Sequence, residues 1–182
     1  ITQSQTISSF LPLRDDLWRT SRAIYAADLV DCFTAEQVEN YPVFKLLLDT
    51  LHRLCQTTNG ELPLRYFELH LLAYVGYRPK LGQCLGCNSH LQPTTNFFSS
   101  SDGGILCPKC HDREPLAHPI SVNALKVMRF FQDSDYNSAS RLRVDPDLSR
   151  ELELLMREYI RYLLEHEVKS AVWLDRLREE SD

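Results

Sequence analysis

The sequence predicts a mostly α-helical protein, a helical bundle that is interrupted once by a small cysteine-rich β-hairpin. Three observations carry this prediction. Apolar residues recur at helical spacing on both sides of the insert, that spacing stops between residues 77 and 119, and Cys, Gly, Pro, Asn and Ser dominate there instead. We therefore expect the first part of the bundle at residues 1–76, the insert at 77–119 and the second part of the bundle at 120–182.

The composition is that of a packed globular chain. Of its 182 residues, 43% are hydrophobic and 25% are charged, which suits one sizeable core with a small insert. No apolar run reaches the roughly 18 to 20 residues that cross a bilayer, and residues 1–5 lack the features of a secretion signal. We expect an intracellular protein without a membrane contact.

The first part of the bundle is expected to hold three helices. The first spans residues 13–34, with apolar positions at Leu17, Ile24 and Leu29 and solvent-facing positions at Arg14, Asp15, Asp16, Arg19 and Arg22. The second follows Pro42 and carries an apolar face of Phe44, Leu47, Leu48, Leu51, Leu54 and Cys55. Residues 57–60 break it, and the third buries Leu64, Phe67, Leu71, Leu72 and Val75 before Gly76 ends it.

The insert is expected to contain one hairpin, after which helices resume. Residues 96–99 and 105–106 are predicted strands, joined by a turn at Asp102, Gly103 and Gly104. Ser121 is placed to cap a helix with apolar positions at Val122, Leu125, Met128 and Phe131, and residues 133–137 are a predicted loop. The last helix opens at Asp145 and Pro146, uses Leu148, Leu152, Leu155, Tyr159 and Leu163, and is expected to run or kink toward Leu177.

Four cysteines of the insert form the most specific motif in the chain. Cys84 and Cys87 make one C-x-x-C pair and Cys107 and Cys110 make a second, with nineteen residues between them. This spacing is typical of a zinc ribbon, in which two turns aim four sulfurs at one point. Because protein fills all four positions, we expect one structural Zn²⁺ rather than a catalytic ion. Disulfides or idle thiols are the alternative, which an intracellular chain disfavours.

The remaining cysteines and histidines show no arrangement for catalysis. Cys32 and Cys55 lie at helical positions and are expected to be small buried thiols. His90 and His111 are alternative metal ligands. Three histidines on the expected helices are interpreted as core or surface side chains, namely His52, His70 and His166. Since the sequence has no recognisable catalytic triad, phosphate-binding glycine loop or Rossmann fingerprint, we do not expect an enzyme.

The charge of the chain limits where nucleic acid can bind. The formal net charge is -5 with His neutral, and a divalent zinc held by four thiolates would bring the total to about -7. Strong nonspecific binding to nucleic acid rests on a basic surface, so any contact must be local. Arg78, Lys80 and Lys109 lie beside the cysteine pairs and are candidate DNA-phosphate contacts, with an ordinary solvated surface as the alternative.

One ordered series of residues matches a known family pattern. It consists of Phe67-Glu68-Leu69, Leu71-Leu72, Gly76-Tyr77, Pro79, Leu81, Cys84 and Cys87, then Phe98-Ser99, Gly103-Gly104, Leu106-Cys107 and Cys110. This series resembles the RecO family of bacterial DNA recombination and repair mediators, and Lys169-Ser170 with Leu174 resembles its closing helix. The stretch from Phe67 to Cys110 is the specific part, because the flanking helices match only as amphipathic pattern.

The resemblance implies a protein that binds single-stranded DNA and anneals complementary strands. It also implies work with a RecR partner to load recombinase onto strands coated by single-strand-binding protein, a cytoplasmic, nucleoid-associated location in bacteria, and no covalent chemistry. Family members carry an N-terminal OB-fold, a barrel that holds single strands. The first twelve residues are too few for it and the chain begins with Ile, so we expect a fragment without that element. Zinc is not universal in the family, and the four cysteines resemble those of the members that keep it.

The bundle is expected to be a protein-docking platform. On the family resemblance, one client is the acidic, apolar-ended tail of single-strand-binding protein, which needs a hydrophobic pocket rimmed by Arg or Lys. The candidate rim residues are Arg19, Arg22, Arg141 and Arg143. The aromatic candidates are Tyr25, Tyr74, Phe130 and Trp173, with plain core packing as the alternative for each.

Two other classes of protein stay open. A zinc-stabilised helical adaptor that binds only proteins would explain the acidity. A transcription-type zinc ribbon would explain the cysteines but not the helices around them. Strand annealing, which a mediator requires and an adaptor does not, separates the first of these classes from a mediator.

Overall fold

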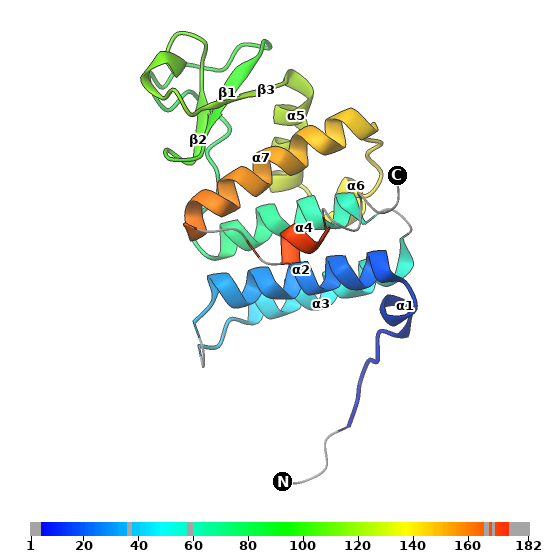
Figure 1. Cartoon of the computed structure of the whole chain (residues 1–182). Helices are drawn as coiled ribbons and strands as arrows, with labels where there is room; N and C mark the ends of the chain where they lie inside the picture. Colours follow the sequence, from blue (N-terminus) through cyan, green and yellow to red (C-terminus); the bar gives the residue numbers. More distant parts are fainter. Residues whose placement is uncertain (1–4, 36–37, 58–59, 166–167, 169, 175–182) are drawn as a thin grey trace.

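The computed structural model describes residues 5–35, 38–57, 60–165, 168 and 170–174 (Figure 1). Helices dominate these residues, and three short strands and one 3-10 turn occur between residues 96 and 120. The predicted mostly helical architecture with a small β insert is confirmed. The predicted helix break at residues 58–59, and His166, Lys169 and Leu177, lie outside the described residues. Within them, no helix is both long enough and apolar enough to cross a membrane.

The single helix predicted at residues 13–34 is in fact two helices. α1 (Leu11–Arg14) is followed by α2 (Leu17–Phe33), and Asp16 caps α2 by accepting a hydrogen bond from the backbone N–H of Arg19 at 3.1 Å. Asp16 therefore starts a new helix instead of continuing one, so its prediction as a position inside a single helix is wrong, while its side chain faces solvent in part, as predicted, with 42% exposed. The buried side chains of α2 are Ser21, Tyr25, Ala26 and Leu29, whereas the predicted apolar positions Leu17 and Ile24 are exposed.

The buried face of α3 (Tyr41–Gln56) is rotated from the predicted one. Its buried residues are Val43, Leu46, Thr50 and Leu54. Phe44, predicted to start the apolar face, is 59% exposed. The helix carries more apolar residues than α1, α2 and α4 can cover, and only the packing partner decides which of them are buried.

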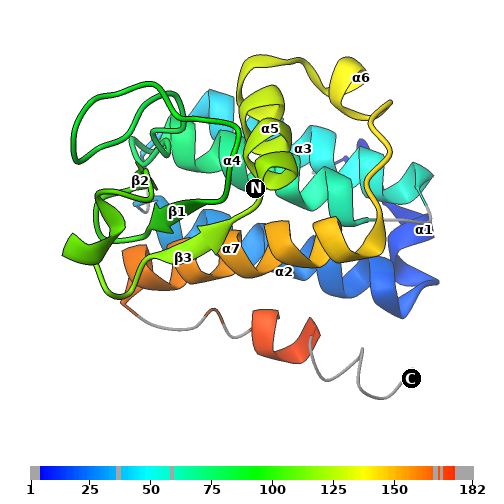
Figure 2. The same ribbon diagram turned by 90° about the horizontal axis from the view of Figure 1, so that it is seen from above.

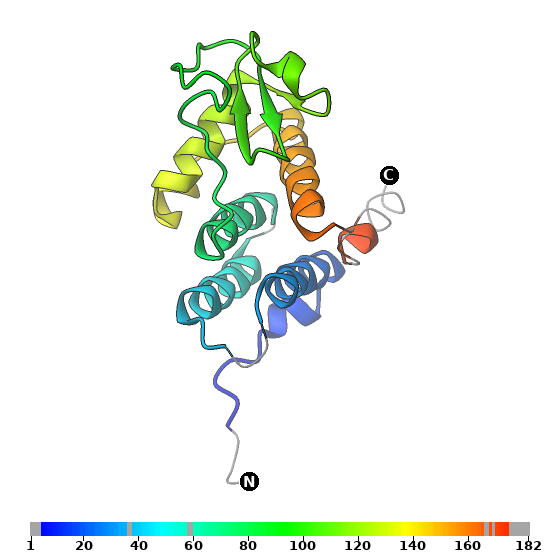
Figure 3. The same cartoon turned by 90° about the vertical axis from the view of Figure 1, so that its left-hand side faces the viewer.

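The central helix is α4 (Glu61–Tyr74). It lies between the α2–α3 pair on one side and α5 (Val122–Asp133) with α7 (Pro146–Leu164) on the other (Figure 3). As predicted, its core residues include Leu64, Phe67, Leu71 and Leu72. As also predicted, Gly76 ends it: φ is 90° there, and the backbone N–H of Tyr77 donates to the Leu72 carbonyl at 2.7 Å.

The insert holds a three-stranded antiparallel sheet in the order β2-β1-β3. The predicted hairpin is β1 (Asn96–Ser99) with β2 (Gly104–Leu106), and its turn contains Gly103 at φ 65°. The sequence prediction missed β3 (His118–Ile120), which pairs with the other edge of β1. Its exposed His-Pro pair gives little strand signal. A 3-10 turn, η1 (His111–Arg113), connects the second cysteine pair to β3.

After the sheet, Ser121 caps α5 as predicted, accepting from the backbone N–H of Ala124 at 3.0 Å. The loop predicted at residues 133–137 is wrong in part, because Asp135 caps a short helix, α6 (Tyr136–Ala139). Asp145 caps α7 as predicted. This helix ends at Leu164 with Glu165 in the left-handed conformation, so it does not run on continuously. Residues 170–174 are helical again, and Ser170 donates a hydrogen bond to Asp28 of α2 at 2.7 Å.

One face of the sheet belongs to the main core of the bundle. Phe98, Ile105 and Ile120 are buried in the same cluster as α4, α5 and α7, and β3 runs beside α7 (Figure 2). Two side chains of α5 also hold the chain that enters the insert: Arg129 donates to the Leu81 carbonyl and Gln132 to the Pro79 carbonyl. The insert, called the ribbon below (residues 77–119), is therefore packed onto the bundle.

Candidate metal centre

The first cysteine pair sits in a tight turn. The backbone N–H of Asn88 donates to the Cys84 carbonyl at 2.8 Å, with Asn88 at φ 58°, and the N–H of Leu85 donates to the Ile105 carbonyl at 2.8 Å. The first bond closes the turn, and the second fastens it to β2. A Cβ added at Gly86 would lie 3.0 Å from the Cys110 sulfur, so the absence of a side chain there lets the two cysteine pairs approach each other.

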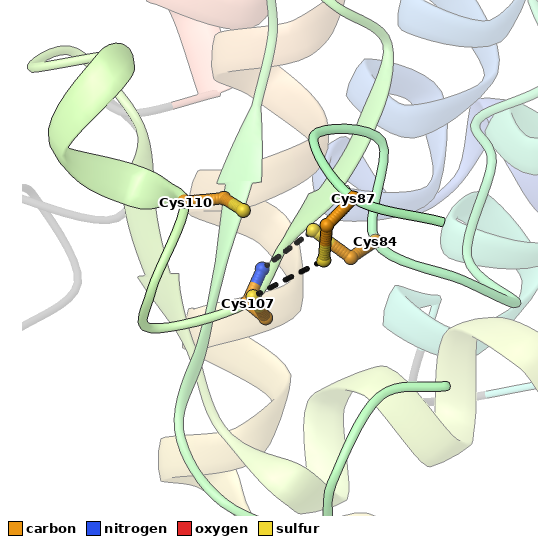
Figure 4. Close-up of side chains that lie close together, drawn as sticks. All are labelled: Cys84, Cys87, Cys107 and Cys110. Atoms are coloured by element: carbon orange, nitrogen blue, oxygen red, sulfur yellow. Dashed lines mark hydrogen bonds between the residues drawn. The ribbon is translucent and has the colours of Figure 1, made fainter. Parts of the chain in front are cut away.

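The second cysteine pair forms a similar turn. The backbone N–H groups of Cys110 and His111 both donate to the Cys107 carbonyl, at 2.9 and 3.2 Å. The backbone N–H of Cys107 donates to the sulfur of Cys84 at 3.2 Å, which joins this turn to the first one. Both turns therefore direct their sulfurs toward the same point, as Figure 4 shows.

The four sulfurs have the separation that a tetrahedral metal site needs. All four lie within 4.8 Å of one another, and the Cys87 and Cys107 sulfurs are 3.9 Å apart. Sulfurs at about 2.3 Å from a shared zinc ion would be about 3.8 Å apart, whereas a disulfide requires about 2.05 Å. All four cysteines are free thiols in the structure. The prediction that Cys84, Cys87, Cys107 and Cys110 converge is confirmed, and the cluster is suited to a metal ion.

Hydrogen bonds favour the thiolate form of two of these cysteines. The Ser89 hydroxyl lowers the pKa of Cys87 to about 6. Burial opposes ionisation of Cys84, but the backbone N–H groups of Cys107 and Cys87 outweigh it and lower the pKa of that thiol. A hydrogen bond with Cys107, together with burial, raises the pKa of Cys110 to about 12. A metal binds thiolates, so the Ser89 hydroxyl and the backbone N–H groups prepare Cys87 and Cys84 for it.

The predicted substitute ligands are not part of the cluster. His111 stacks on Phe97 with ring centroids 3.9 Å apart, and its Nδ1 lies 2.8 Å from the Pro108 carbonyl. His90 pairs with Gln83 in an isolated antiparallel bridge. The metal donors in the described part of the ribbon are therefore the four cysteines alone.

The candidate DNA contacts lie around the cluster but differ in freedom. Lys109 lies between the cysteines of the second pair and is exposed. Lys80 is exposed as well, with its backbone bonded to Gly103 and Ile105. Arg78 forms an ion pair with Asp133 at 2.8 Å, and about half of its side chain is exposed.

The candidate rim arginines fall into two groups. Arg22 pairs with Glu61 at 2.6 Å and is mostly buried, and Arg19 donates to the Cys55 carbonyl at 2.9 Å. Both therefore join helices to each other, and the prediction that they face solvent freely is wrong because α3 and α4 supply their partners. Arg141 and Arg143 are exposed in the connection from α6 to α7.

The aromatic candidates also divide. Tyr25 is a core residue whose hydroxyl donates to Glu68 at 2.8 Å. Tyr74, Phe130 and Trp173 remain 51%, 39% and 36% exposed. The prediction that Cys32 is a buried thiol is wrong, since it is exposed, and Cys55 is half-buried.

A buried ionic group escaped the sequence prediction. Arg65 and Glu68 lie one turn apart on α4 and form an ion pair at 2.7 Å, with both side chains almost fully buried. Burial raises the pKa of Glu68 to about 7. Burial also disfavours the Arg65 charge, but Glu68 and neighbouring groups outweigh it and raise the pKa of Arg65. The i, i+3 spacing was visible in the sequence, but nothing there indicated that α4 is the central helix.

Comparison with known proteins gives a consistent result. The family described as "Recombination protein O C terminal" matches residues 14–171. A protein named DNA repair protein RecO from Dehalococcoides mccartyi (strain CBDB1) is 43% identical over 178 residues, which is 98% of this chain and 70% of the relative. A protein of the same name from Roseiflexus sp. (strain RS-1) is 41% identical over 98% of this chain and 63% of its own length. Another, from Symbiobacterium thermophilum, is 35% identical over 98% of this chain and 72% of the relative.

These matches cover both parts of the bundle and the whole ribbon, including the cysteine cluster. They extend the resemblance in the stretch from Phe67 to Cys110 to nearly the entire chain. The chain belongs to the RecO family of DNA repair proteins.

Proposed function

We propose that this chain is the zinc-bearing helical part of a recombination mediator that acts on single-stranded DNA without covalent chemistry. The observation that carries the proposal is the family match over nearly the whole chain, in a fold whose most specific site is a closed cysteine cluster. The His52 ring lies 4.9 Å from the Phe10 ring, and His70 Nε2 lies 2.9 Å from the Phe131 carbonyl, so the proposal gives both histidines a packing role. In this proposal the protein works on the bacterial chromosome by binding and positioning partners.

The cluster would hold one structural Zn²⁺. Four sulfur donors, the separations given above and the absence of charge-balancing carboxylates among the donors all suit zinc. When bound, the ion would cross-link the two cysteine turns and supply no open coordination position. The two cysteine turns, joined in this way, would hold Lys80 and Lys109 in place on the ribbon surface.

We infer that Arg78, Lys80 and Lys109 contact DNA phosphates. Their support is exposure beside two turns that a metal would make rigid. Replacing all three with Ala should weaken binding to every single-stranded sequence alike, because phosphate contacts carry no base identity. The slope of log affinity against log salt should fall by about 0.7 for each phosphate interaction that the substitutions remove. Titration of a labelled oligonucleotide at several salt concentrations measures it, and an unchanged slope would make these residues ordinary surface.

The mediator role also includes protein partners. We propose that the bundle receives RecR and the tail of single-strand-binding protein, since Tyr74, Phe130 and Trp173 offer partly exposed aromatic surface and Arg141 and Arg143 are exposed cations. These residues are distributed over several elements of the bundle, so the test must compare them separately.

The competing function is an adaptor that binds proteins only, which the net charge of -5 favours. Strand annealing separates the two. A protein extended by an N-terminal OB-fold of the family type should anneal complementary strands, and this chain should modulate that activity through the ribbon residues. Failure of the extended protein to anneal, with intact binding to protein partners, would favour the adaptor.

A further inference from the structure

A groove of about 810 Å³ lies between the ribbon and the C-terminal part of α7, which lie side by side (Figure 3). Its walls come from the turn between β1 and β2, the loop after η1, β3 and α7. Ser101 donates to Glu114 at 3.0 Å, which joins the turn to the loop. His118 of β3 lies 3.1 Å from Glu158 of α7, which joins the ribbon to the helix. Both walls are therefore held in place before any partner binds.

The groove exposes apolar side chains from both walls. Leu116 of the ribbon is 81% exposed, and the backbone N–H of Ala117 donates to the Glu114 carbonyl at 2.9 Å, which closes the turn that presents it. On the α7 side, Tyr162 is 52% exposed and Leu163 is half-buried. Single exposed apolar side chains are ordinary on a protein surface. Two that line one groove from different elements form a surface from which a partner can exclude water.

The charge of the groove is negative. Its lining residues include three glutamates and one arginine, a net charge of -2 with the histidine neutral. Arg161 is paired with Glu158 at 2.5 Å, whereas Glu114 accepts from the neutral hydroxyl of a serine. Glu165 is exposed at the end of α7, where the helix dipole adds negative potential. A cation near Glu114 and Glu165 would therefore be stabilised, and a phosphate or carboxylate would be repelled.

We propose that this groove binds a segment of a partner protein that carries an arginine next to an apolar residue. The apolar residue would cover Leu116, the guanidinium would lie near Glu114 and Glu165, and the Tyr162 ring can stack on the guanidinium plane. The volume lies within the range of binding sites for small ligands and side chains.

Charge complementarity selects this partner over the ligands of the proposed function. Single-stranded DNA and the acidic tail of single-strand-binding protein are both negatively charged, as is the groove. The groove is therefore a docking site in addition to the basic residues of the ribbon and the aromatic residues of the bundle.

Three labelled peptides of equal length test the site by fluorescence anisotropy with this chain. In the first, arginines alternate with leucines; in the second, glutamates replace the arginines; in the third, serines replace the leucines. The first peptide should bind saturably at low salt. The other two should bind about tenfold more weakly or less, because each lacks one of the two features that the groove recognises.

Two variants of the groove should weaken binding of the first peptide. Glu114→Gln combined with Glu165→Gln should cost about threefold to tenfold in affinity and flatten the salt dependence, because two attractive charges are removed. Leu116→Ser should cost about fivefold or more, because the apolar contact is lost. Circular dichroism melting checks that each variant is folded.

Each variant has a matched control at the other end of the molecule, where α1 and the start of α7 lie (Figure 1). Asp15→Asn combined with Asp147→Asn removes the same charge from two exposed positions. Leu11→Ser removes a leucine that is 57% exposed. Neither control should change the affinity for the first peptide.

A loss of affinity confined to the groove variants supports the site. Equal losses from the groove variants and their controls would show attraction to the overall negative charge and would overturn it. The site is also overturned if the glutamate peptide binds as tightly as the arginine peptide. Light scattering that shows a dimer, dissociated by the groove variants, would make the occupant a second copy and overturn the proposal as well. Failure of the ribbon to bind oligonucleotides would leave these outcomes unchanged, since the peptides carry no phosphate.

Discussion

Cys84 is the fully buried member of the cysteine cluster, and its sulfur accepts the backbone N–H of Cys107. We expect purified protein to carry about one zinc per chain and Cys84→Ser to lose it, because a serine hydroxyl is a poor replacement for a thiolate. The ribbon of the variant should unfold, since structural zinc sites of this kind often supply the folding free energy. Elemental analysis and circular dichroism measure both effects.

Cys32→Ser is the control for that experiment. Cys32 is exposed on α2, far in sequence from the cluster, and its replacement should change neither the zinc content nor the melting curve. A folded, metal-free wild-type ribbon with two disulfides would contradict the zinc prediction.

Glu68 provides a prediction on pH. Its pKa is about 7 in the folded chain, raised by burial from its ordinary value of 4.5. The folded state therefore holds a proton that the unfolded state releases, and stability from this group is complete below pH 4.5 and is lost as pH rises through about 7. The loss is at most about 3 kcal/mol, because one pKa unit corresponds to about 1.4 kcal/mol.

Glu68→Gln removes this titration. Urea unfolding at several pH values should show that the difference in unfolding free energy between wild type and variant changes between about pH 4.5 and 7. Below about pH 4.5 the two proteins should differ little, because residue 68 is uncharged in both, whereas above about pH 7 the wild type alone should have lost up to about 3 kcal/mol and the variant should be the more stable of the two. Asp112→Asn, at an exposed carboxylate, is the control. A constant difference across this range would show that Glu68 has the same pKa in both states.

At the scale of elements, the start of α5 is tied to α7 through one residue. Ser121 caps α5, and its hydroxyl and backbone N–H both donate to Glu151, at 2.7 and 2.6 Å. Ser121→Ala removes the cap and one bond to a partly buried carboxylate. We expect a loss of about 1 to 2 kcal/mol in unfolding free energy, measured by urea denaturation.

Asp145→Ala gives the comparison, because Asp145 caps α7 from an exposed position and contacts no second helix through its cap. Its loss should be about 1 kcal/mol or less. An equal or smaller cost for Ser121→Ala would mean that the bond to Glu151 adds nothing to the cap.

At the scale of the whole molecule, the test concerns docking on the bundle. A labelled peptide with the acidic, apolar-ended character of the single-strand-binding protein tail should bind this chain saturably at low salt. Removal of its terminal apolar residue should abolish binding, because that residue would occupy the pocket. Fluorescence anisotropy measures both.

Variants locate the site. Three variants are compared: the double variant Tyr74→Ala and Phe130→Ala, the single variant Trp173→Ala, and the double variant Arg141→Ala and Arg143→Ala. All five side chains are exposed or partly exposed. The variant at the pocket should reduce affinity by about tenfold or more, a typical cost for an interface anchor. Binding that does not saturate at low salt would reject the platform.

The sequence alone determined the features that depend on local geometry. Two C-x-x-C pairs with a hairpin between them bring Cys84, Cys87, Cys107 and Cys110 together, because each pair folds within its own turn. Gly76 and Gly103 have the positive φ expected of glycine at a helix end and in a hairpin turn, and Ser121 caps α5. Each of these features depends on only a few neighbouring backbone groups. The specific part of the family pattern runs from Phe67 on α4 into this ribbon as far as Cys110.

Only the tertiary structure decided which surfaces are covered. α3 buries Val43 and Leu46 but exposes Phe44. Cys32 on α2 is exposed, whereas the charged side chains of Arg65 and Glu68 on α4 are buried. The partner of a helix face comes from distant parts of the chain, and hydrophobic burial has no direction of its own, so periodicity gives the presence of a face but not its angle.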